Sequence, residues 1–412
     1  MMILDRLKTL PPATIEKWLF GLVIVFLPTQ LGKHFWPDWS YVFSLKIDYL
    51  AVTIYFWDIL VFFLWVFYLK RARINWKAVV LLGLFFTTSA FSMFFSSNWQ
   101  VGLSRLINWL PAGLFGVYIA SIPGLEVKAI IKRWLPVSVV ISALIAFLQI
   151  IFGRDIGLWI LGERDFSLST TSIATFNWYG QIFLRPYATF PHPNVFAAFM
   201  LLCGFVLLFL SGIKHNIQKV FHFLIATAVF FSFSRASIAI YTVLVLFLLR
   251  KQFLVLVLLF LFLSPVLFVR FDSAFNFDQL SLIRREELAE TAMIIFMQNP
   301  FLGVGLNNFI PEAMSSVFLS GTNRFLQPVH NIFLLVLAES GLVGLVGFLI
   351  FLLYPVVYYK ESDLLNRSQV VGLLLIMVFL GAIDHYFLTL PQGQRIFFLI
   401  WGMSLSRQLV KH

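Results

Sequence analysis

Runs of apolar residues recur along the whole chain, and most are about 15 to 25 residues long, near the roughly 20 that a helix needs to cross a bilayer. Charged and turn-forming residues separate the runs. This pattern predicts an all-α polytopic membrane protein with about twelve transmembrane helices. The predicted spans are 15–31, 50–69, 78–95, 107–122, 135–152, 195–213, 220–233, 236–249, 253–269, 332–357, 370–383 and 396–410.

Two of the predicted outer segments, 153–194 and 270–331, are much longer than the other connections. Loops of this length are usually functional or disordered, and these two are rich in Phe, Leu, Ile and Trp, which favours an ordered cover over the membrane surface. Within the second segment, Gln279 to Gln298 has apolar residues near helical spacing, and Asn299 and Pro300 end the pattern. We predict an interfacial helix there.

Composition supports the membrane class. Hydrophobic residues make up 60% of the chain, charged residues 12%, and the mean hydropathy is +0.91, so there is too little polar surface for a water-soluble globule. The first span has a basic flank without a small-residue cleavage site, so we expect it to remain as a helix. The single cysteine, Cys203, lies in an apolar span and excludes a disulfide framework. We predict one membrane domain, 1–412.

The net charge of +11 is explained by topology. Lys and Arg remain on the cytoplasmic side of a membrane, and alternate connections of this chain are basic, with Lys70, Arg73, Lys128 and Lys132 among their residues. Both termini are therefore predicted to be cytoplasmic and both long segments extracytoplasmic. No soluble domain carries a basic patch with interleaved aromatic residues, so we do not expect nucleic-acid binding.

The outer side carries the candidate chemistry. Arg235 lies in a turn between two predicted spans of about 14 residues each, too short to reach the full bilayer thickness, so the turn should be recessed. A recessed arginine needs an acid, a carbonyl or an anionic ligand; a structural pair with Glu339 or a lipid phosphate is the alternative to a functional site. Arg284 and Arg285 lie in the predicted interfacial helix and could equally form a solvated face.

His330 lies at the outer entrance of span 332–357, where a lipid-carried headgroup would meet an aqueous acceptor. Histidine can accept a proton near neutral pH, although a histidine at such a position is often structural. Glu339 lies further along the same span, and Gly341, Gly344 and Gly347 follow it at a spacing that favours close helix packing.

Four sequence pieces together resemble the O-antigen ligase and polymerase superfamily. They are the stretch from Arg185 to Asn194, the turn around Arg235, Arg285 followed by the stretch 299–309, and His330-Asn331 with Glu339 and Gly341. They occur in the family's order and on the side selected by charge. Two positions depart from the family pattern: Ala188 stands where glycine is common, and Ala236-Ser237 stands where Gly-Ala is usual.

The resemblance implies a glycosyltransferase of the bacterial plasma membrane with an extracytoplasmic active site. It would transfer a glycan from an undecaprenyl-diphosphate carrier to an acceptor hydroxyl of a glycan, a lipid A–core or a protein, without a metal or another cofactor. Arginine forks match phosphate oxygens, so Arg185, Arg235 and Arg285, with the adjacent Arg284, are the expected diphosphate-binding set. His330 is the expected general base. Asn194, Asn331 and Glu339 are expected to orient or support the other site residues.

Four other functions remain open at this point. A polymerase or a protein O-oligosaccharyltransferase of the same superfamily would use nearly the same chemistry. A metal-dependent glycosyltransferase could use Asp38 and Asp48 of the first outer loop, although they are not closely paired. A lipid-linked oligosaccharide flippase could also have twelve spans and phosphate-binding arginines, but its charged groups should lie near mid-membrane.

Overall fold

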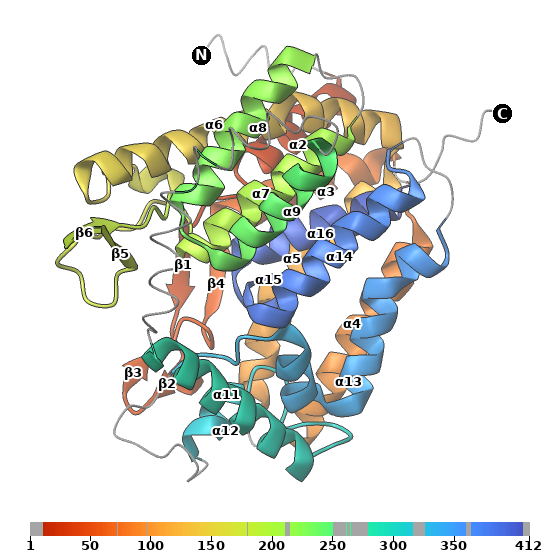
Figure 1. Cartoon of the computed structure of the whole chain (residues 1–412). Helices are drawn as coiled ribbons and strands as arrows, with labels where there is room; N and C mark the ends of the chain where they lie inside the picture. The colour runs from red at the N-terminus through yellow and green to blue at the C-terminus, as the bar shows by residue number, and fades with distance from the viewer. Residues whose placement is uncertain are drawn as a thin grey trace, which may run out of the picture.

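The computed structural model describes residues 11–71, 73–96, 98–178, 180–210, 215–249, 261, 264, 279–315, 326–359 and 364–406. Of the sequence predictions, the ninth span (apart from residues 261 and 264) and the first part of the second outer segment lie outside the described residues. The described part is mostly helical, which agrees with the predicted class (Figure 1).

The helices are α2 (Pro12–Val25), α3 (Phe56–Tyr68), α4 (Trp76–Phe91), α5 (Trp99–Ser121), α6 (Gly124–Phe152), α7 (Pro193–Phe209), α8 (His215–Phe231), α9 (Arg235–Leu249), α11 (Gln279–Gln298), α12 (Phe309–Ser315), α13 (Ile332–Val357), α14 (Arg367–Ile383), α15 (Tyr386–Thr389) and α16 (Pro391–Ser404). Three antiparallel strand pairs accompany them: β1 (Gly32–Phe35) with β4 (Val52–Tyr55), β2 (Tyr41–Val42) with β3 (Leu45–Lys46), and β5 (Thr175–Trp178) with β6 (Gln181–Leu184).

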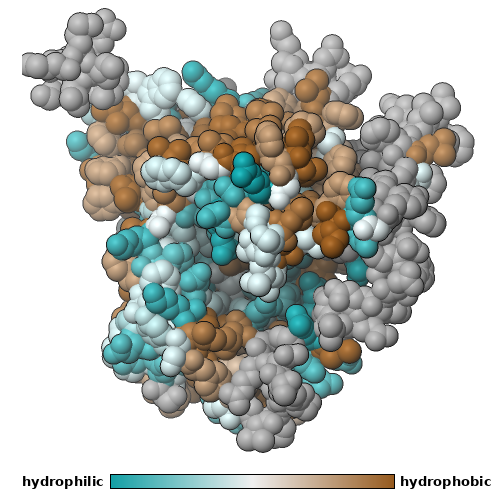
Figure 2. All heavy atoms as spheres, turned by 90° about the vertical axis from the view of Figure 1, so that its left-hand side faces the viewer, coloured by the Kyte–Doolittle hydropathy of each residue, from teal (hydrophilic) through white to brown (hydrophobic). Residues whose placement is uncertain are grey.

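Among the described residues, three helical segments are long and apolar enough to cross a membrane: Trp76–Phe95, Gly124–Phe152 and Ile332–Val357. Shorter apolar helices include α3, α7 and α14. The protein is therefore an integral membrane protein, while the count of twelve spans remains a prediction. On the face shown in Figure 2, hydrophobic side chains dominate the upper part and hydrophilic ones gather in a band below it.

Helix bounds agree with the sequence in some places and differ in others. Helices α11 and α13 cover the predicted residues. The predicted span 50–69 is wrong at its start, because residues 52–55 pair with β1 as a strand and the helix begins only at Phe56. Spans 107–122 and 135–152 are too short, because α5 and α6 begin further upstream. The predicted span 15–31 extends too far at its end, because helix α2 stops at Val25, before a turn and β1.

Close helix packing forms the core of the bundle. Helix α16 packs against α5, and α13 packs against α4 (Figure 1). Gly116 and Gly402 allow the first contact, because a Cβ on Gly402 would overlap the Gly116 carbonyl. Aromatic rings fill the centre: Phe351 stacks on Trp401 with centroids 4.4 Å apart and on Phe85 at 5.0 Å. Such pairs stabilise the bundle beyond the area they bury.

Helix α13 is broken at Gly341, whose φ of 61° and ψ of −162° are not helical. A break frees backbone donors and acceptors that must find partners in a buried region. The segment 300–305, between α11 and α12, supplies them through its own backbone. The four bonds are Val304 N to Ala338 O (3.1 Å), Gly305 N to Glu339 O (2.9 Å), Leu342 N to Pro300 O (2.9 Å) and Val343 N to Phe301 O (3.1 Å).

Candidate active site

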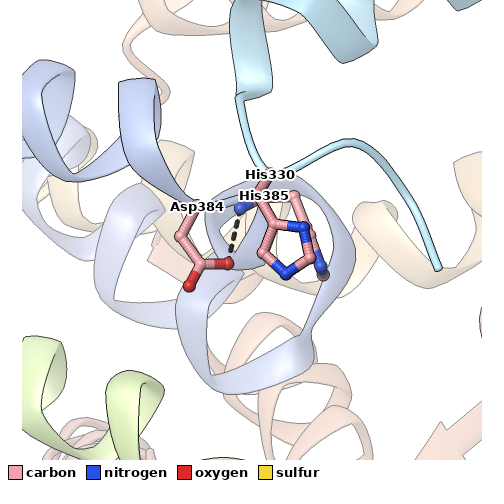
Figure 3. A group of neighbouring side chains, drawn as sticks. All are labelled: His330, Asp384 and His385. Atoms are coloured by element: carbon pink, nitrogen blue, oxygen red, sulfur yellow. Dashed lines mark hydrogen bonds between the residues drawn. The ribbon is translucent and has the colours of Figure 1, made fainter. Parts of the chain in front are cut away.

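His330, Asp384 and His385 form a compact group where the N-terminus of α13 meets the connection between α14 and α15 (Figure 3). One nitrogen or oxygen atom from each side chain lies within 4.8 Å of the others. The two imidazole rings are 5.1 Å apart and nearly perpendicular, at 67°. Asp384 Oδ1 accepts the backbone N–H of His385 at 2.8 Å, so the carboxylate is held beside both histidines.

Asn331 holds His330 at the entrance of α13. Its side-chain oxygen accepts the backbone N–H groups of Phe333 (2.9 Å) and Leu334 (3.1 Å), which caps the helix. His330 therefore directly precedes a helix N-terminus whose position is fixed by this cap. Its Nδ1 is buried and has no hydrogen-bond partner among the residues that the structure describes.

Thr389 fixes the tautomer of His385. The Thr389 hydroxyl donates to the His385 carbonyl at 3.0 Å, so its oxygen is left to accept a bond from His385 Nδ1, which lies 2.6 Å away. A neutral His385 then carries its proton on Nδ1. Its Nε2 keeps a free lone pair.

The electrostatics of this group favour neutral histidines beside an ionised acid. Burial lowers the pKa of His385 to about 3, with Asp384 opposing the shift. Burial also lowers the pKa of His330; Asp384 raises it and Arg285 lowers it further. Burial alone would raise the pKa of Asp384, but the three neighbouring histidines and Arg285 together lower it. At neutral pH the site therefore holds a carboxylate and uncharged imidazoles.

His192 joins this group from the first outer segment. Its Nδ1 accepts the backbone N–H of Asn194 at 3.1 Å and caps α7, so a neutral His192 carries its proton on Nε2 and can donate it to a ligand. Burial, followed by the charge of Arg185, lowers its pKa to about 4. Asp384, His330 and Arg285 are also close enough to affect this pKa. Charged residues of both long outer segments thus act on His192.

Arg185 connects the first outer segment to the turn before α9. Its Nε donates to the Ser232 carbonyl at 2.8 Å, and its Nη2 donates to Asn194 Oδ1 at 2.9 Å. Next to it, Phe176 of β5 stacks on Phe233 with ring centroids 3.9 Å apart. Asn194 therefore orients Arg185, and the β5–β6 hairpin packs on the turn that carries Arg235.

Arg235 is the first residue of α9, at the end where a helix favours anions. Its Nε is buried and has no hydrogen-bond partner within the described ranges. Unpaired buried guanidinium N–H groups are costly, so this one is suited to an anionic ligand. The structure shows no ion pair between Arg235 and Glu339 among the described residues.

The two neighbouring arginines of α11 are in different places. Arg285 is half-buried, and its Nη1 donates to the Ile383 carbonyl at 3.4 Å, beside Asp384. Arg284 is exposed. Only Arg285 is thus placed at the histidine group.

Glu339 lies apart from the histidine group and supports the loop before α12. Its Oε1 accepts the Tyr49 hydroxyl at 2.8 Å and the Phe309 backbone N–H at 3.3 Å. Arg105 packs over the Tyr49 ring at 4.2 Å, donates to Asn307 Oδ1 at 2.6 Å, and reaches the carbonyls of Leu388 and Thr389. This network ties the segment around Asn307 to the segment that carries His385.

The sequence analysis did not assign His192, Arg105, Asp384 or His385 to the site. His192 lay within the stretch from Arg185 to Asn194. Asp384 and His385 stood out only as polar residues between two apolar runs, which is itself a signal of function in a membrane protein. Asp38 and Asp48 belong to no group of potential metal ligands among the described residues, whereas His330, Asp384 and His385 do.

One region of the chain matches a known family. No curated protein matches the chain. Residues 220–349 match the family described as O-Antigen ligase, and this region contains Arg235, Arg285, His330 and Glu339. Arg185, Asp384 and His385 lie outside it but are brought beside it by the fold. The match over residues 220–349 supports the O-antigen ligase and polymerase superfamily, which the sequence motifs indicated.

Proposed function

We propose that the protein transfers a glycan from an undecaprenyl-diphosphate carrier to an acceptor hydroxyl at the outer face of the bacterial plasma membrane. The family match supports a glycosyltransferase-like enzyme. One observation supports the finer proposal: Arg285 donates to the Ile383 carbonyl next to Asp384, which lies in one group with His330 and His385. Arg185 is bonded to Asn194, whose backbone N–H bonds to His192, and the charges of Arg185 and Arg285 both lower the pKa of His192. Positive charge and a proton acceptor are therefore available in the same region.

The arginines bind the diphosphate of the donor. Arg285 reaches the histidine group from α11, and Arg235 offers a buried Nε that lacks a partner among the described residues. Arg185 is oriented by Asn194 and Ser232. As the bond from the sugar C1 to the phosphate oxygen breaks, negative charge develops on the leaving diphosphate, and fixed guanidinium groups stabilise it. Arg284, exposed on α11, contributes positive charge near the membrane surface.

His330 acts as the general base. The acceptor oxygen bonds to the sugar C1, its proton passes to the neutral imidazole of His330, and undecaprenyl diphosphate leaves. Asp384, beside the ring, stabilises the imidazolium that forms. In this mechanism Asn331 positions His330 by capping α13, and Glu339 supports the surrounding loop. The protein's own residues complete the step without a metal.

Transfer by purified protein in detergent tests the proposal. Metal-free protein is supplied with an undecaprenyl-diphosphate-linked glycan and, in separate reactions, a lipid A–core, a second lipid-linked glycan or a protein acceptor. The product identifies a ligase, a polymerase or a protein O-oligosaccharyltransferase. Absence of every product would favour the flippase, which needs no transfer chemistry. Product that forms only after a divalent metal is added would instead favour a metal-dependent enzyme.

The neighbouring arginines of α11 provide a matched test of diphosphate binding. Arg285→Lys keeps the charge but removes the two-pronged geometry, so we expect transfer to fall at least about tenfold. Arg284→Lys changes an exposed side chain and should stay within about twofold of the wild type. Transfer rates and membrane abundance are measured for both. Equal rates for the two variants would remove Arg285 from the site.

A further inference from the structure

The group of His330, Asp384 and His385 has the composition of a zinc site. Two imidazoles and one carboxylate are ligand types that Zn²⁺ prefers, and three protein ligands leave a coordination position open. Their donor atoms lie within 4.8 Å of one another, against about 3.3 Å between ligand atoms in a tetrahedral site. Rotation of the His330 and Asp384 side chains can bring the donor atoms to the spacing of a tetrahedral site.

Donor atoms of these side chains are also available to a metal. Metal binding requires neutral imidazoles and an ionised carboxylate. The bond to Thr389 leaves the lone pair of His385 on Nε2, and the buried Nδ1 of His330 has no partner among the described residues. No described residue forms an ion pair with Asp384 that would compete for its carboxylate.

The surroundings supply the outer bonds that orient metal ligands. Thr389 holds His385 through Nδ1, and the His385 backbone N–H holds Asp384 through Oδ1. The charge of Arg285 opposes a cation here, so binding should be weaker than at a four-ligand structural site.

We propose that His330, Asp384 and His385 bind one Zn²⁺ reversibly, and that the bound ion inhibits glycan transfer. Inhibition rests on the proposed function, because the ion occupies the lone pair that His330 needs as a base. Binding itself does not rest on it. The enzyme is thus active without metal and is switched off by free zinc.

Cobalt provides a direct readout of binding, since Co²⁺ in such a site has visible absorption that spectroscopically silent Zn²⁺ removes on displacement. Metal-free protein in detergent is titrated with Co²⁺ and then with Zn²⁺. We expect one site per chain, loss of that site in His385→Gln, and about 10- to 100-fold weaker binding in Thr389→Val. His34→Gln, at a histidine of β1 remote in sequence, should bind as the wild type does.

The second readout is transfer measured with increasing Zn²⁺, each variant relative to its own metal-free rate. The wild type should be inhibited, and Thr389→Val should need about 10- to 100-fold more Zn²⁺ for the same inhibition. Unchanged Co²⁺ binding in both His385→Gln and Thr389→Val, or no stoichiometric binding by folded wild-type protein, would overturn the proposal. Absence of transfer by metal-free wild type would count against the proposed function only, because the cobalt titration needs no substrate.

Discussion

Replacing His330 with alanine should reduce glycan transfer about 100- to 10,000-fold, the contribution expected of a general base. Donor binding should persist, because Arg185 and Arg285 are held by other partners and not by His330. Initial transfer rates and the affinity for the lipid-linked donor are measured on the same preparations. Loss of donor binding together with transfer would instead place His330 in the phosphate site.

His330→Gln separates proton transfer from positioning. Glutamine can hydrogen-bond the acceptor but cannot take its proton, so this variant should be as impaired as His330→Ala. The pH profile gives a second check. Because the pKa of His330 is lowered below its ordinary value of 6.5, the neutral base persists to lower pH, and wild-type transfer should fall only on acidification below that value. A variant with glutamine that retains most activity would show that His330 only positions the acceptor.

Gly341→Ala should prevent the protein from accumulating in a folded form. The φ and ψ of Gly341 lie in a region that is essentially restricted to glycine, which costs about 1 to 3 kcal/mol for another residue. In addition, a Cβ at this position would overlap the backbone of Phe301 and Leu302, which cannot move without losing bonds to α13. The combined cost of the backbone strain and the overlap is a large share of the free energy of unfolding of a typical protein. Membrane abundance and thermal unfolding in detergent measure the effect.

Gly83→Ala is the matched control in the neighbouring helix α4. No atom lies within 4 Å of a Cβ added there, and alanine favours a helix, so this variant should be as stable as the wild type or slightly more so. If Gly341→Ala were equally well tolerated, the break in α13 would not be required for folding.

The sequence predicted best those elements whose ends are marked locally. Helix α11 stops at Asn299 and Pro300, and α13 starts at the capping Asn331, so both ranges follow from neighbouring residues. Residues 52–55 were assigned to a helix because they are apolar. Their partner strand, β1, lies about 20 residues away in the chain and sets their conformation instead.

The same distinction applies to the candidate site, where residues in short motifs were predicted and residues that only the fold brings together were not. His330 and the arginines were found because each stood in a short motif. His192, Asp384 and His385 meet only when α7, α13 and the end of α14 come together, and no spacing in the sequence encodes that meeting. Arg105 lies just before the predicted span 107–122, and backbone carbonyls and Asn307 satisfy its guanidinium, so α5 begins upstream of it.

The bonds between the segment 300–305 and the broken helix α13 also bear on biogenesis. Until that segment docks, Leu342 and Val343 lack their backbone acceptors, and the carbonyls of Ala338 and Glu339 lack their donors. The two halves of α13 can therefore adopt their final arrangement around Gly341 only once residues 300–305 have docked. Folding of α13 is thus coupled to a segment that lies before it in the chain, and that segment must be in place when α13 forms.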